Sequence, residues 1–214
     1  MHSFKYAAVA ALLAAANLAQ ATQLSVTGAV APASAAACAA HISGNIGHGL
    51  VDPSALKTGE LTKLPSRTLQ YSIQCTVPTL IALAWHDERR GTSNVTAPIS
   101  IPTSTFGLGL HKGAKVGHYK ILMGRPGTTA DELPARMLRT LRDDVWDSSW
   151  LGFVRHGVGE RYSYKRLEAP DRPQAFQQYS GSIIVHTWIA QAETLDLDEH
   201  LPLDGQATLE LQYL

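Results

Sequence analysis

Short stretches of alternating apolar and polar residues recur along this chain. A strand that buries one face shows this period of two, because successive side chains point to opposite faces. Turn residues separate the stretches, and the glycine-bearing residues 111–117 suit a hairpin connection. The stretches predicted as strands are residues 24–30, 69–75, 81–85, 106–110, 119–123, 182–190 and 207–213. Several short strands with turns between them predict an all-β protein, a sandwich or a barrel.

Residues 134–145 fit two patterns. A pair of strands around Asp143 and Asp144 agrees with the all-β reading of the chain. A short helix fits equally well, because apolar residues recur here at helical spacing with arginines on the other side. The apolar residues are Met137, Leu138, Leu141 and Val145. The fold class is therefore a β-sandwich with at most one short helix.

The start of the chain has the features of an export signal. Residues 1–6 carry one lysine, residues 7–16 are small or apolar, and Ala19-Gln20-Ala21 has the small-x-small pattern that signal peptidase cleaves. The apolar run is shorter than the roughly 20 residues that span a bilayer. We therefore expect a signal peptide at residues 1–21, a single domain at residues 22–214, and export to the periplasm and then the cell surface.

The charge balance excludes some partners. The chain has 18 basic and 18 acidic residues, and loss of Lys5 with the signal would leave 17 basic residues. A nucleic-acid-binding domain carries a basic stripe, and docking to an anionic membrane also requires excess positive charge. The sequence predicts no nucleic-acid partner and no membrane span after signal cleavage.

Cys38 and Cys75 are the only cysteines in the chain. An exported protein meets an oxidising environment, so an isolated pair predicts one intramolecular disulfide. A reactive thiol or a metal pair is the alternative, but neither a Cys-x-x-Cys spacing nor a Cys/His cluster accompanies the cysteines. We expect a disulfide, with no bound metal and no cofactor.

Enzyme signatures are absent from the sequence. It contains no Gly-x-Ser-x-Gly elbow, no phosphate-binding Gly-Lys-Ser/Thr and no His-Glu-x-x-His. We therefore name no catalytic residue and predict that the protein is not an enzyme.

The tryptophans suggest a binding alternative. Trp146 and Trp150 could form an exposed platform that stacks on a sugar ring. They could equally cap the core from a loop, because tryptophan is usually well buried. Trp85 and Trp188 lie inside strand patterns and are predicted to be core residues.

Several short motifs together resemble a known family. An early Gly28-Ala-Val30 strand, a second cysteine that ends Tyr71–Cys75, and a last strand with penultimate Tyr213 are similar to chaperone-usher pilins. Closer still is the resemblance to an exported, fimbria-associated family, domain of unknown function 1120. That resemblance is carried by Phe106-Gly-Leu-Gly109, by Gly117-His-Tyr119 and by the ending Leu203–Leu214.

The resemblance implies an immunoglobulin-like sandwich that lacks its last strand. A groove beside the C-terminal strand would be filled first by a periplasmic chaperone and then, at the usher, by a strand from a neighbouring pilin-like subunit. Main-chain hydrogen bonds supply the affinity of such strand addition, and alternate side chains in pockets set its register. The resemblance places Ala207, Leu209, Leu211 and Tyr213 on the groove edge.

The resemblance leaves the donor strand open. Cleavage after Ala21 leaves only two residues before Leu24, so the first alternating strand would itself have to be the donor. Its inserted face would be Leu24, Val26, Gly28 and Val30. Without a donor, the protein would be a terminal or accessory subunit. The expected function is thus a fimbrial structural or accessory subunit, and the alternative is a self-complete, adhesin-like domain that binds a surface glycan.

Overall fold

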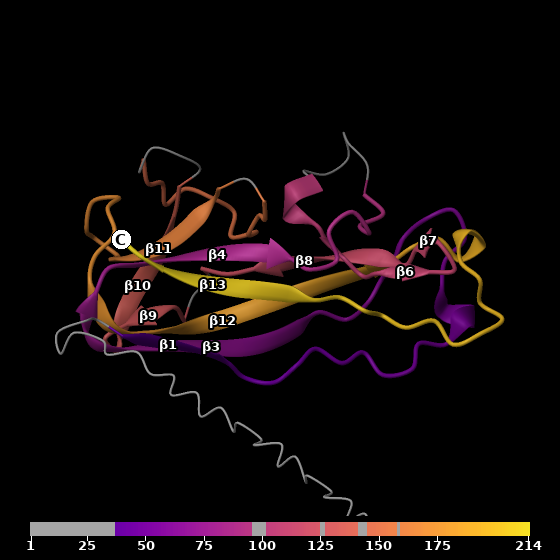
Figure 1. Ribbon diagram of the computed structural model, residues 1–214, viewed down its shortest axis with the longest axis horizontal. Helices are drawn as coiled ribbons and strands as arrows, with labels where there is room; N and C mark the ends of the chain where they lie inside the picture. Colours follow the sequence, from indigo (N-terminus) through magenta and orange to yellow (C-terminus); the bar gives the residue numbers. More distant parts are fainter. Residues whose placement is uncertain (1–36, 96–101, 125–126, 141–144, 158) are drawn as a thin grey trace, which may run out of the picture. The chain divides into compact units, whose positions relative to one another are not determined.

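The computed structural model describes one compact unit within Ala36–Leu214 (Figure 1). The residues described are 37–95, 102–124, 127–140, 145–157 and 159–214. The predicted signal peptide and the predicted strand at residues 24–30 lie outside them. No helix in the described part of the chain is long and apolar enough to cross a membrane.

One layer of the fold is built around its two longest strands, β3 (Arg67–Thr79) and β12 (Phe176–Ile189). All pairings in this layer are antiparallel. The other strands of the layer are β1 (Cys38–Ile42) beside β3, β2 (Thr62–Lys63) and β8 (Gly117–Leu122) beside β12, and β5 (Phe106–Gly107) beside β8.

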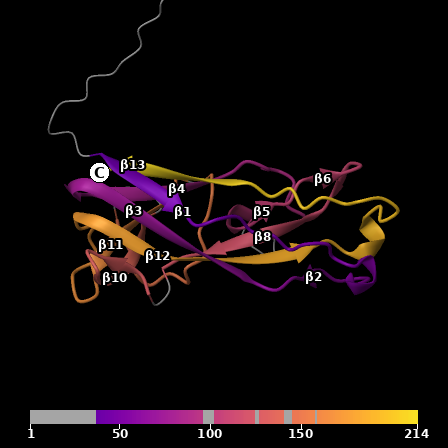
Figure 2. The same ribbon diagram turned by 90° about the horizontal axis from the view of Figure 1, so that it is seen from below.

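The second layer is a run of antiparallel strands that ends at the C-terminal strand. In spatial order it contains β10 (Leu133–Thr140), β11 (Arg161–Arg166), β4 (Ile81–Asp87) and β13 (Ala207–Tyr213). The short β9 (Thr129–Ala130) pairs with both β12 and β10 and so connects the two layers. Figure 2 shows β1 and β13 at neighbouring margins of the two layers. The protein is therefore an antiparallel β-sandwich, as the alternation predicted.

Several shorter elements lie outside the two layers. A small hairpin of β6 (Leu110–His111) and β7 (Ala114–Lys115) overlaps residues 111–117, the stretch predicted to be a hairpin connection, and takes its first residue from the predicted strand at 106–110. The helical elements assigned in the described residues are three single 3-10 turns, Pro53–Ala55, Pro102–Ser104 and Ala192–Thr194.

The core lies between the layers and follows the alternation of the strands. Along β12, residues from Gly181 to Ile189 alternate between buried and half-buried positions. The largest buried side chains include Tyr162, Tyr164 and Tyr179. Tyr164 donates a hydrogen bond to the Tyr71 hydroxyl over 3.0 Å, which satisfies a polar group that would be costly to bury alone.

The ambiguity at residues 134–145 is resolved in favour of a strand. β10 covers residues 133–140 and pairs with β11 in continuous register. The helical alternative is wrong for these residues because cross-strand pairing overrides a short apolar periodicity. Residues 141–144 lie outside the described part. The predicted disulfide between Cys38 and Cys75 is confirmed.

Candidate functional site

The C-terminal strand β13 has one unpaired edge. It pairs with β4 from Ala207 opposite Asp87 to Tyr213 opposite Ile81, and no described strand pairs with its other side. Just outside the strand, Glu88 donates to the Gln206 carbonyl and Leu214 donates to the Leu80 carbonyl. Antiparallel hydrogen bonding alternates, so the backbone groups of residues 207, 209, 211 and 213 point to the free edge.

Most side chains of residues 207, 209, 211 and 213 point toward the core. Ala207, Leu209 and Leu211 are half-buried and pack against the core. Tyr213 is 54% exposed, and its hydroxyl accepts a hydrogen bond from the Cys38 N–H over 3.0 Å. Three of the four predicted groove-edge residues therefore face inward, whereas Tyr213 reaches across to β1.

β1 forms the opposite margin. Thr76 donates to the Ala37 carbonyl and Ser43 donates to the Gln70 carbonyl, so the backbone groups of Cys38, Ala40 and Ile42 point away from β3. The first residue of β1 contacts the last residue of β13, and Ile42 and Ala207 line the same hollow. β1 and β13 consequently run in opposite directions, and a strand inserted between them would be parallel to one and antiparallel to the other.

A hollow of about 510 Å³ lies between these margins. We call it the groove. Its lining is mostly apolar, a composition that suits pockets for large apolar side chains. The residues contributed by the core are Leu69, Trp85, Leu108, Tyr119, Ile121, Ile183 and Val185.

The groove continues into a second hollow of about 720 Å³ beyond the end of β1. Ile46, His48 and Leu203 line both. His48 Nε2 lies 3.0 Å from Thr187 Oγ1, and partial burial, with a smaller contribution from the charge of Arg67, lowers the pKa of His48. The sequence patterns missed the residues that line the second hollow, because most of them lie outside regular strands. The one local signal is Ile46, an apolar residue isolated among glycines.

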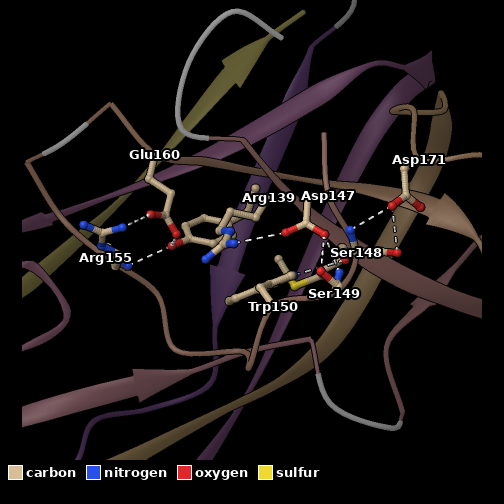
Figure 3. Close-up of polar contacts among 10 residues, drawn as sticks. Arg139, Asp147, Ser148, Ser149, Trp150, Arg155, Glu160 and Asp171 are labelled. Atoms are coloured by element: carbon tan, nitrogen blue, oxygen red, sulfur yellow. Dashed lines mark hydrogen bonds and ion pairs between the residues drawn. The ribbon is translucent and has the colours of Figure 1, made fainter. Parts of the chain in front are cut away.

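The loop that carries Trp146 and Trp150 is tied down by polar contacts (Figure 3). Trp150 is half-buried. Its ring packs at a tilt against Tyr162, with centroids 4.9 Å apart, and its indole N–H donates to the Met137 carbonyl. Trp146 lies 5.9 Å from the guanidinium of Arg161. Trp150 thus packs on the core, which fits the capping interpretation of this loop better than a shared sugar platform.

Acidic side chains hold that loop in place. Asp147 accepts hydrogen bonds from the backbone and side chain of Ser149 and pairs with Arg139 at 3.0 Å, and these contacts lower its pKa. Asp171 accepts two bonds from Ser148. Figure 3 shows these contacts in one network, which anchors the loop.

Trp85 and Trp188 differ in position. Trp85 is a core residue with 5% of its surface exposed, as predicted. The prediction was wrong for Trp188, which is half-buried on the outer face of β12. Local alternation separates the two faces of a strand but does not say how well each face is covered.

Comparison with known proteins agrees with part of this description. Residues 24–120 match the model of a family described as protein of unknown function, DUF1120. Protein GltF of Escherichia coli (strain K12) is 27% identical over 243 residues, covering 96% of this chain and 93% of GltF. The chain is therefore similar to both over segments that include β1 and the cysteine pair.

Proposed function

We propose that this protein is an exported, pilin-like structural or accessory subunit that binds a β-strand of another chain in its groove. The observation that carries the proposal is the free edge of β13 beside an apolar groove. Exported pilin-like subunits would use such an edge first for a periplasmic chaperone and then, at an usher, for a neighbouring subunit.

The chemistry of β13 supports strand addition. Proteins usually protect an exposed edge with proline, lysine or a bulge. β13 contains neither proline nor lysine, and its register against β4 is continuous. Its free backbone groups and its inward apolar side chains belong to the same residues, so an added strand would gain hydrogen bonds and bury side chains together.

The proposal includes a donor. The face formed by Leu24, Val26, Gly28 and Val30 has the alternation that the groove of a neighbouring copy would accept. Those residues lie outside the described part, so the support for this role is their sequence alone.

The experiment is periplasmic expression of residues 22–214 with and without a cognate periplasmic chaperone taken from the gene neighbourhood. We expect aggregation alone and a soluble complex with the chaperone. Leu209→Glu should abolish the complex because it places a charge on the inward, apolar face of β13. Thr208→Glu is the matched control, because Thr208 is exposed on the opposite face of the same strand.

A stable, chaperone-independent monomer would contradict the proposal. It would favour the self-complete binding domain. Equal retention of the complex in both glutamate variants would instead mean that β13 is not the contact strand.

A further inference from the structure

The outer face of the first layer carries a group of rings and lysines. On β12, His186 pairs with Lys120 of β8, and Trp188 pairs with His118 of β8 and with Lys63 of β2. Side chains directly opposite one another on adjacent strands share a face and touch. Residues distant in sequence are thereby collected on one surface.

The contacts within this group are close. The rings of His118 and Trp188 stack with centroids 5.1 Å apart. Lys63 Nζ and Lys120 Nζ lie 5.5 and 5.9 Å from the Trp188 ring. Lys120 Nζ also lies 5.7 Å from the ring of Phe153. We call Lys63, His118, Lys120, Phe153, His186 and Trp188 the ring-lysine cluster.

Two lysines give the cluster its positive charge. In the described part of the chain, neither Lys63 nor Lys120 forms an ion pair, whereas Lys57, Lys112 and Lys165 each pair with a carboxylate. Partial burial lowers the pKa of Lys120. Two lysines without a described carboxylate partner would attract the acidic group of a ligand.

Beyond Ile184 of β12, the same face is polar and uncharged. Ser182 pairs with Gln70, and Ser180 pairs with Ser72. Thr68, Gln70 and Ser72 are exposed. Hydroxyl and amide groups along these strands can exchange hydrogen bonds with a polyhydroxylated chain.

We propose that this face binds an acidic polysaccharide, with carboxylates of the sugar units at Lys63 and Lys120 and sugar C–H groups against Trp188 and Phe153. Two lysines are too few for the dense phosphates of a nucleic acid or for an anionic membrane. The site is separate from the groove and does not depend on the proposed strand binding.

The test is native gel electrophoresis of the folded protein through gels that contain polygalacturonate, dextran or polyglutamate. We expect retardation by polygalacturonate alone. Lys63→Ala/Lys120→Ala should weaken it by about fivefold, which corresponds to about 1 kcal/mol for the two exposed ion contacts together. Lys57→Ala/Lys115→Ala removes the same charge elsewhere and is the matched control.

A second variant tests the ring. Trp188→Leu should also reduce retardation, and its melting temperature separates loss of binding from loss of the fold. The lysine variant keeps the proposal testable if Trp188→Leu unfolds. Absence of retardation by polygalacturonate, equal retardation by polyglutamate, or equal loss in the control variant would each overturn the proposal.

Discussion

At the scale of single residues, the tertiary environment of His118 changes its chemistry. The ring is buried at 3% exposure, stacks on Trp188 and has Nδ1 2.7 Å from Asn94 Oδ1. Burial, with a smaller contribution from the charge of Lys120, lowers the pKa of His118 to about 4. The imidazole therefore stays neutral at pH values where a free histidine is protonated.

This shift predicts a specific pH dependence of stability. Below about pH 6.5 the unfolded chain binds a proton at His118 that the folded protein does not bind, so stability falls until pH approaches the folded pKa of about 4. Between pH 7 and pH 4.5 we expect a loss of about 2 kcal/mol from this group. Urea denaturation of wild type and His118→Asn at both pH values measures it. A variant with the same pH dependence as wild type would refute this origin.

At the scale of elements, the β9–β10 hairpin shows how a turn connects the layers. Asp131 and Glu132 adopt φ values of 43° and 62°, the left-handed conformation required at both positions of a tight hairpin turn. The Asp131 carboxylate accepts the backbone N–H groups of Gln177 and Gln178. It therefore fixes the turn to the irregular start of β12, where the register with β3 shifts.

Replacement of Asp131 should weaken this connection. Asp131→Ala removes the acceptor of two backbone donors and should cost about 2–3 kcal/mol of unfolding free energy, since hydrogen bonds to charged groups are worth more than neutral ones. Asp131→Asn keeps an acceptor and tolerates the left-handed backbone, so its loss should be smaller. Chemical denaturation compares the two. Equal losses would show that the carboxylate contacts are not the cause.

At the scale of the whole described unit, the groove lies between its first strand, β1, and its last strand, β13. The Cys38–Cys75 bridge fixes β1 to β3 across a sequence separation of 37 residues. Contact with Tyr213 then sets β1 beside the last strand. The disulfide thus stabilises one margin of the site.

Removal of the bridge tests this role. Cys38→Ala/Cys75→Ala should lower the unfolding free energy by about 4 kcal/mol on the chain-entropy account of a loop of this length. Amide exchange should increase most in residues 38–42 and less in β10 and β11. Unchanged protection of β1 would mean that strand pairing alone holds the margin.

Much of the fold was predictable from local pattern. Alternation located the strands at residues 69–75, 81–85 and 207–213, and these became β3, β4 and β13. The inward face of β13 was predictable for the same reason. The strand at residues 133–140 was not, because its apolar residues fit a helix equally well until pairing with β11 is known. The two-part groove was not predictable either, because Ile46 and Leu203 lie in irregular segments.

The sequence by itself determined an all-β chain, the disulfide between its two cysteines and the face of each clear strand, because period, cysteine number and turn residues act locally. Only the tertiary structure decided that β13 has a free edge, that Trp188 lies outside the core and that Lys63 and Lys120 meet over one ring. These features depend on which distant strands become neighbours. Strand order is set when the complete sandwich packs together, so it cannot be read from any single stretch of sequence.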